Sequence, residues 1–174
     1  MGVAASQKQP GPCPYVVGDD GLARWSQMHA DAWIGLLEVA KRMTRELDGE
    51  LEARYGIGLS SLELLGRLAA ADEQRMRLSS LAEAAHLSLS RVSRIVDALE
   101  RRELVERRQC PNDARSVEAQ LTGAGLELTR RAQATHFAAV QERFFAQLDV
   151  EELATLAGVF GRLAPGSPQA CSGS

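Results

Sequence analysis

Residues 78–122 change their hydrophobic period partway along, and this change limits the folds open to the chain more than any other feature. "LAEAA" at 81–85 supports a helix of barely two turns, which "HLS" at 86–88 interrupts. A second short helix follows, with Val92, Ile95, Val96 and Leu99 at the spacing of one buried face. The helical period then gives way to "LVERR" and "VEAQLT", two runs that suit β-strands.

The residues between these two runs predict a tight connection. "QCPNDARS" at 109–116 contains Pro, Asn and Asp, each of which favours a bend in the chain for its own local reason. The two runs therefore form a β-hairpin directly after two short helices joined by a tight turn. We interpret this order as a winged helix-turn-helix, in a fold that is mostly α with a small β-hairpin wing.

Longer helices flank this segment. Apolar residues at helical spacing from Leu22 to Leu47 predict a first helix that ends near Arg54, before Gly56 and Gly58. After Thr122 the helical pattern returns and runs to Leu148, and a last helix extends to Leu163.

Serine and aspartate residues mark the expected helix starts. Ser60 with Glu63, and Ser80 with Glu83, have the spacing of a capping box, in which side chains and backbone N–H groups bond reciprocally. Ser88 offers a cap to the second short helix, and Asp149 with Glu152 caps the last one.

These patterns divide the chain into a winged helix-turn-helix part and a helical part. We expect flexible tails over 1–20 and 164–174, a winged helix-turn-helix over 58–122, and a helical dimerisation region over 21–57 and 123–163. The terminal helices hold more apolar surface than a small winged helix needs to cover, which favours a homodimer with interleaved helices. Packing within one chain alone remains the alternative.

The basic charge is concentrated in one segment. Residues 75–115 hold nine arginines against six acidic residues, a balance of +3 that leaves −6 for the rest of a chain whose formal net charge is −3. Such a segment suggests a local anionic partner. The alternative is a solvated helix face, because Glu100, Glu103 and Glu106 alternate with the arginines.

In a helix-turn-helix the second helix enters the DNA major groove with its N-terminal residues nearest the base edges. Arginine can donate two hydrogen bonds to guanine O6 and N7, and small hydroxyls can approach a phosphate or a base. On the exposed first turns of this helix we therefore expect DNA contacts from Ser88, Ser90, Arg91, Ser93 and Arg94.

The wing has a different expected task. Arg115 lies where a guanidinium can enter a narrow minor groove, and Asp113 can hold that side chain or the loop. Arg107 and Arg108 suit phosphates, although one of the two should face away because neighbours on a strand alternate.

The same residues carry a resemblance to a known family. The helix order, "LVERR" with Asp113-Ala-Arg115, and "LTGAG" at 121–125 resemble the MarR family of bacterial transcriptional regulators over roughly residues 22–163. The resemblance implies an obligate homodimer, a recognition helix at 89–101, a wing arginine at Arg115 and a pseudo-palindromic double-stranded DNA operator. It also implies a small effector, often aromatic, bound between the dimerisation helices and the DNA-binding lobe, in what is most often a repressor.

Two positions depart from the family pattern. His86 and Glu103 stand where the family usually has glycine. Both turns can require a positive φ, which glycine adopts freely and other residues only at a cost.

Three further sets of residues are candidate sites. Trp25, His29, Trp33 and Tyr55, with Tyr15, could line an effector pocket, although aromatics at helical spacing are more often core or dimer contacts. Cys110, beside Arg107 and Arg108, could act as an oxidation sensor, with an ordinary exposed thiol as the default. His29, His86 and His136 lack the spacing of a metal site, so we expect no metal.

Other classes of protein fit less well. We find no glycine-rich phosphate loop, metal-binding helix motif or nucleophile elbow, so we expect neither an enzyme nor a cofactor. A winged helix used only for protein contacts should not have arginines on the recognition helix and on the wing together, and this chain has them. No run approaches the roughly 18 apolar residues of a membrane span, and no signal peptide is evident, so we expect a cytoplasmic protein.

Overall fold

The computed structural model describes residues 15–110 and 113–164, of which the side chains of 110 and 113–116 are not described. It divides into two compact units, one reaching to Arg45 and the other starting at Glu46, and the division falls within the first long helix. The helices and strands, in chain order, are β1 (Tyr15–Val17), β2 (Ala23–Trp25), α1 (Gln27–Tyr55), α2 (Leu59–Ala70), η1 (Asp72–Gln74), β3 (Arg75–Arg77), α3 (Leu78–Ala84), α4 (Leu89–Glu100), β4 (Val105–Cys110), β5 (Asp113–Leu121), α5 (Gly123–Arg143), η2 (Phe145–Gln147) and α6 (Val150–Leu163).

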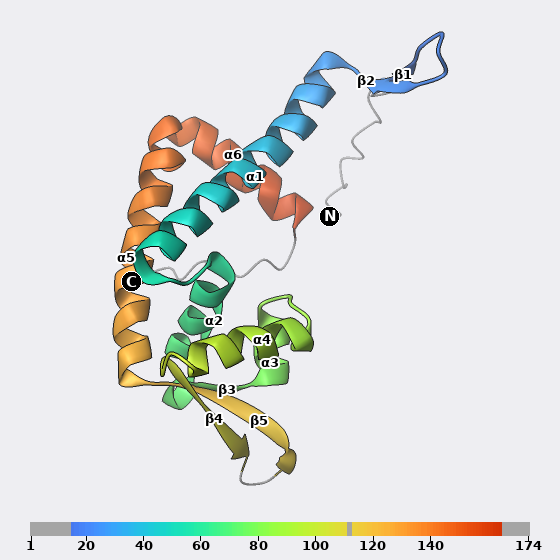
Figure 1. Cartoon of the computed structure of the whole chain (residues 1–174). Helices are drawn as coiled ribbons and strands as arrows, with labels where there is room; N and C mark the ends of the chain where they lie inside the picture. The colour runs from blue at the N-terminus through green and yellow to red at the C-terminus, as the bar shows by residue number, and fades with distance from the viewer. Residues whose placement is uncertain (1–14, 111–112, 165–174) are drawn as a thin grey trace, which may run out of the picture. The chain divides into compact units, whose positions relative to one another are not determined.

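The second unit is a winged helix-turn-helix, and the expected fold class is confirmed. α3 and α4 form the helix-turn-helix, and β3, β5 and β4 form a three-stranded antiparallel sheet in that spatial order. In Figure 1 the β4–β5 hairpin extends away from α3 and α4. The sequence did not predict β3, because three residues are too few to show a period. In the structure, Met76 packs on the core between exposed Arg75 and Arg77, which is the alternation of a strand.

One hydrophobic core holds this unit together. Its buried side chains come from the C-terminal end of α1, from α2, α3 and α4, from the strands of the wing and from α5. Leu64, Leu65 and Leu68 of α2 are fully buried, as are Val92 and Val96 of α4. The buried stripe of α4 is therefore the one that the spacing of its apolar residues predicts.

The unit that precedes Glu46 begins with a hairpin where the sequence predicts a tail and then the first helix. β1 pairs antiparallel with β2, with Tyr15 opposite Trp25, and α1 starts at Gln27 rather than at Leu22. Asp20 fixes the turn, because it accepts hydrogen bonds from Leu22 N at 3.1 Å and from Arg24 Nη1 at 2.9 Å. The Arg24 guanidinium lowers the pKa of Asp20 from 3.8 to about 2. The tail expected over residues 1–14 lies outside the described residues.

Two of the four expected side-chain caps are absent. α2 starts one residue before Ser60 and is capped from another helix, since Asp48 Oδ1 accepts from Leu59 N at 2.7 Å. α3 starts at Leu78, two residues before Ser80, without a side-chain cap. The caps at Ser88 and Asp149 are confirmed, the latter as a complete capping box with Glu152. The two wrong predictions share a cause: a serine and a glutamate at the right spacing also occur inside the first turn of a helix.

The long helix after the wing ends earlier than its apolar residues suggest. α5 stops at Arg143, and Phe144 leaves the helical conformation before the single turn of η2. No helix among the described residues is long and apolar enough to cross a membrane.

Candidate nucleic-acid interface

Helix α4 presents a polar stripe opposite its buried face. Ser90, Arg94, Ala98 and Arg101 are exposed and recur at spacings of three and four, so they share one side of the helix. The N-terminal end is fixed by Ser88, whose Oγ accepts from Arg91 N at 3.3 Å and lies 3.2 Å from Ser90 Oγ. Hydroxyls and guanidinium groups therefore occupy the exposed side of the first turns.

The other two candidates on α4 have partners within the protein. Arg91 is exposed, and its Nη2 donates to Ser60 Oγ on α2 at 3.2 Å. Ser93 is half-buried and faces the wing, where its Oγ and its carbonyl oxygen accept from Arg107 Nη2 at 3.1 and 2.9 Å. Of the five α4 candidates, Ser93 is thus the least available to an outside partner.

The two arginines on β4 have different surroundings, as the alternation of a strand predicts. Arg107 is half-buried against α4, and its Nη2 lies 2.6 Å from Asp97 Oδ1. Its Nε lies 3.5 Å from Glu100 Oε2, an ion-pair distance without hydrogen-bond geometry. Its backbone N donates to Glu100 Oε1 at 3.1 Å. Arg108 is exposed and, among the described side chains, pairs with exposed Glu106 alone, at 3.2 Å.

Arg107 therefore ties the wing to α4, whereas Arg108 remains accessible from solvent. Arg107 is thus the one of the two that faces away from solvent, and a phosphate contact of Arg108 stays a prediction. Asp113 and Arg115 lie on β5 and Cys110 lies at the end of β4, but their side chains are outside the described residues. Their roles stay predictions.

Two residues at this surface escaped the sequence interpretation. Leu89, the first residue of α4, is 53% exposed although it is apolar; only its place beside Ser88 and Ser90 could have indicated a surface role. Arg102, in the turn after α4, donates from Nη1 to Gly56 O at 2.5 Å and from Nη2 to Tyr55 O at 2.7 Å. In the sequence, Arg102 is one of nine arginines in the segment 75–115, and its spacing does not distinguish it from the others.

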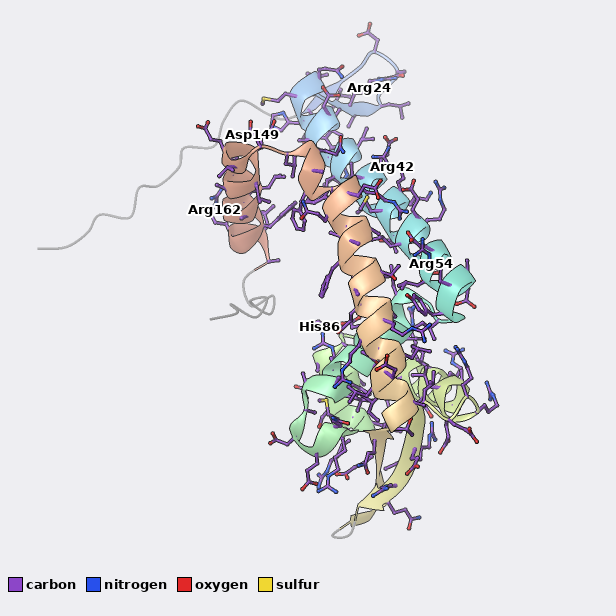
Figure 2. All side chains as sticks on the ribbon, turned by 90° about the vertical axis from the view of Figure 1, so that its left-hand side faces the viewer. Arg24, Arg42, Arg54, His86, Asp149 and Arg162 are labelled. Carbon is purple, nitrogen blue, oxygen red and sulfur yellow. The ribbon has the colours of Figure 1, made fainter. Side chains whose placement is uncertain are left out.

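The two residues that stand where the family usually has glycine both adopt the positive φ that the family pattern indicates. His86 has φ 53° and Glu103 has φ 56°. His86, labelled in Figure 2, marks the turn between α3 and α4. In the turn after α4, Glu103 N donates to Glu100 O at 2.8 Å and Leu104 N donates to Leu99 O at 3.0 Å. This pair of bonds is a Schellman motif, whose left-handed residue is usually glycine.

An open groove of about 480 Å³ lies between α2 and α5. Apolar atoms of Leu59, Leu62, Gly66, Ala70 and Phe137 line it, together with polar groups of Ser60, Glu63, Arg67, Gln133 and His136. Among the residues that the structure describes, the Nδ1 atom of His136 is buried without a hydrogen-bond partner, and burial lowers the pKa of this histidine. His136 thus lines a groove of mixed polarity.

The four residues expected to bind an effector do not line this groove. Tyr55 packs on α5, where its hydroxyl lies 3.1 Å from Arg131 O and 2.7 Å from Thr135 Oγ1. Trp25, His29 and Trp33 belong to the N-terminal unit, and His29 Nδ1 lies 2.7 Å from Ser26 Oγ. Among the described residues, no group of three or more His, Cys, Asp or Glu side chains has a metal-binding arrangement.

Comparison with known proteins points to one family. The model of the MarR family matches residues 60–117, from α2 to β5. The crystal structure of AbsC, a MarR family transcriptional regulator from Streptomyces coelicolor, is 34% identical and superposes with a TM-score of 0.75, covering 81% of this chain and 95% of AbsC. Sco3205 from the same organism, a MarR family transcriptional regulator solved in complex with DNA, is 31% identical with a TM-score of 0.75, covering 84% of this chain and 92% of Sco3205.

A third relative is the uncharacterized HTH-type transcriptional regulator YhbI of Bacillus subtilis. It is 37% identical over 92 residues, which cover 51% of this chain and 59% of YhbI. The chain therefore aligns with about three fifths of the length of that protein.

Proposed function

Because this chain belongs to the MarR family of transcriptional regulators, we propose that it binds a pseudo-palindromic DNA operator as a homodimer and represses transcription. Sco3205, a relative that shares the fold, was solved in complex with DNA. The observation that carries the proposal is the exposed stripe of α4, on which Ser90, Arg94 and Arg101 share one side of a helix whose other side is buried.

The proposal assigns each part of the chain a task. Residues 58–122 contact DNA, and residues 21–57 and 123–163 form the dimer. On α4, Arg94 and Arg91 contact base edges in the major groove, with Ser88 and Ser90 beside them. Arg91 must first leave Ser60, to which it donates in the free protein. On the wing, Arg108 contacts a phosphate and Arg115 enters the minor groove.

Selection of operators from random duplexes tests this function directly, since the recovered site reports both DNA binding and two-fold symmetry. Arg94→Ala should weaken binding by about 1–3 kcal/mol per half-site and flatten the base preference at one position. Arg130→Ala is the matched control, because Arg130 is equally cationic and exposed but lies on α5. Recovery of no sequence, or equal effects of the two substitutions, would contradict the proposal.

A small aromatic acid or phenol is the effector we propose, bound in the groove between α2 and α5. Its ring would contact Leu62 and Phe137, and its polar group would lie beside Gln133 and His136, which line the same groove. Ser60 lines the same groove and accepts from Arg91 of the recognition helix. An effector bound beside Ser60 can therefore change the position of an arginine needed at the operator.

Titration of the operator complex with salicylate or another aromatic acid tests the effector. Release of DNA should depend on the groove, so that Phe137→Asp abolishes release while operator affinity in the absence of the acid is kept. Release that persists unchanged in Phe137→Asp would exclude this groove.

A further inference from the structure

The carbonyl groups that end α1 are bonded by an arginine from the DNA-binding unit. The last carbonyls of a helix have no partner within it, and those of Tyr55 and Gly56 accept from Arg102 Nη2 and Nη1 at 2.7 and 2.5 Å. Arg54, labelled in Figure 2, marks this end of α1. A cation at this point is also favoured by the negative end of the helix dipole.

Gly56, the residue directly after α1, has φ 63°, which glycine adopts freely. A Cβ atom added there would lie 3.4 Å from Nη1 of Arg102, an ordinary contact distance, so the backbone conformation rather than space favours glycine. Both guanidinium nitrogens donate to successive carbonyls, so the planar group has a defined orientation.

The backbone of Arg102 moves with the recognition helix. Arg102 N donates to Leu99 O at 3.1 Å, and the Schellman bonds of Glu103 and Leu104 close the same turn. Leu99 and Leu104 are buried in the core. The turn is therefore a fixed extension of α4, and the side chain of Arg102 carries its position to α1.

The other end of the connection is fixed as well. The hydroxyl of Tyr55, whose carbonyl accepts from Arg102, lies within hydrogen-bond distance of Arg131 O and Thr135 Oγ1 on α5. Arg131 also lies over the Tyr55 ring, with its guanidinium carbon 5.7 Å from the ring centre. Arg102 thus joins α4 to a junction of α1 and α5, two helices of the proposed dimerisation region.

We propose that Arg102 is a positioning residue that fixes α4 relative to the end of α1 and thereby sets the half-site spacing accepted by the dimer. The inference rests on the proposed DNA-binding function. Recognition helices of a dimer contact half-sites about one helical turn or a multiple of it apart. Changing this spacing by one base pair moves a half-site by about 3.4 Å along the axis and roughly 35° around it. Only a dimer in which α4 is held firmly to the dimerisation helices can discriminate such a step.

The experiment measures binding of the purified full-length protein to duplexes that carry the selected half-sites at spacings from two base pairs shorter to two longer. The wild type should prefer one spacing by at least about tenfold. Arg102→Ala should bind the best spacing more weakly and accept its neighbours within about threefold. Its base preference within a half-site and its salt dependence should stay those of the wild type, since Arg102 contacts no DNA.

Two further variants separate positioning from other roles. Arg102→Lys should restore part of the spacing preference, because an ammonium group can still donate to a carbonyl. Arg130→Ala is the control, because it removes an exposed arginine that lies on α5 and outside the proposed DNA contacts, and it should keep the wild-type spacing preference. Circular dichroism and thermal unfolding identify variants that do not fold. If Arg102→Ala is one of them, an intermediate preference in Arg102→Lys against an unchanged one in Arg130→Lys carries the test.

The outcomes are distinguishable. A spacing preference in Arg102→Ala equal to that of the wild type overturns the inference. If the alanine variant does not fold, a spacing preference in Arg102→Lys equal to that of Arg130→Lys overturns it as well. A preserved preference with a shallower slope of log affinity against log salt also overturns it and makes Arg102 a phosphate contact, since each lost contact lowers the slope by up to roughly 0.9. If the wild type selects no duplex at all, the DNA-binding function fails before Arg102 is tested.

Discussion

The task of each arginine in this chain follows from the oxygen atoms around it rather than from its place in a basic segment. Arg107 faces two carboxylates and the oxygens of Ser93, so its charge is used within the protein. Arg102 faces two backbone carbonyls. Within the described part of the chain, Arg94 makes a single long contact of 3.4 Å, from Nε to Ser90 O, which leaves most of its donors for an outside partner.

Replacing Arg107 with alanine should therefore destabilise the fold more than replacing Arg108. The first change removes the bonds to Ser93 and leaves Asp97 and Glu100 without their cation, at an expected cost of about 1–2 kcal/mol because both carboxylates remain partly solvated. Arg108 pairs with one exposed carboxylate, so Arg108→Ala should cost about 0.5 kcal/mol or less. Urea unfolding of both variants measures the difference, and equal midpoints would show that Arg107 does not hold the wing to α4.

Leu89 should contact a thymine methyl group in the operator. It is exposed at the end of α4 that lies nearest the bases in a helix-turn-helix, and an apolar side chain can recognise the C5-methyl of thymine. Exchanging the contacted thymine for deoxyuridine removes one methyl group, worth about 0.8 kcal/mol or roughly fourfold in affinity per half-site. Leu89→Ala should be insensitive to the exchange. The affinities of the wild type and of Leu89→Ala, each measured with thymine and with deoxyuridine DNA, test the contact. If no thymine-to-deoxyuridine exchange changes the affinity of the wild type, Leu89 makes no such contact.

At the scale of helices and turns, two Schellman motifs define the helix-turn-helix and the start of the wing. After α3, His86 N donates to Glu83 O at 3.1 Å and Leu87 N donates to Ala82 O at 3.0 Å, the same pattern as after α4. In each motif the left-handed residue is not glycine, and the leucine that follows packs in or against the core. The packing of Leu87 and Leu104 thus outweighs the backbone strain at His86 and Glu103.

Glycine at position 103 should relieve this strain. Glu103 is exposed, and its side chain supports no described hydrogen bond. Glu103→Gly should stabilise the fold by about 0.5–1 kcal/mol, the part of the left-handed penalty that exceeds the added entropy of the unfolded chain. Ala98→Gly, inside α4, should instead cost about 0.5–1 kcal/mol. Thermal unfolding compares the two; a loss of stability in Glu103→Gly would show that the turn carries no strain.

Some of these elements were predictable from the sequence and others were not. The buried stripe of α4 was predictable because its apolar residues, such as Val92 and Val96, recur at helical spacing. The hairpin of the wing was predictable because the helical period is lost over 105–121. The cap of α2 was not predictable, since Asp48 reaches Leu59 N from eleven residues away, and α3 starts without a side-chain cap. The partners of Arg102 and Arg107 likewise depend on which helices meet in three dimensions, which local spacing does not record.

For the molecule as a whole, large apolar side chains remain exposed at both ends of the chain. In the unit that ends at Arg45 they include Trp25, Met28 and Trp33, and in α6 they include Val150, Phe160 and Leu163. No residue of α6 is buried. Exposed apolar surfaces of this kind support the homodimer proposed above.

The last prediction concerns this apolar side of α6. In a two-fold dimer each substitution acts twice, and burial of one phenylalanine contributes about 1.5–3 kcal/mol, so Phe160→Asp should weaken dimerisation roughly 100-fold or more. The variant should keep the winged helix-turn-helix folded, because Phe160 lies outside its core. Glu151→Ala changes an exposed polar residue of the same helix and should leave the assembly unchanged. Light scattering at micromolar concentration should give a dimer mass for the wild type and Glu151→Ala, and a monomer mass for Phe160→Asp with unaltered circular dichroism. A monomeric wild type, or a dimer that Phe160→Asp leaves intact, would remove α6 from the interface.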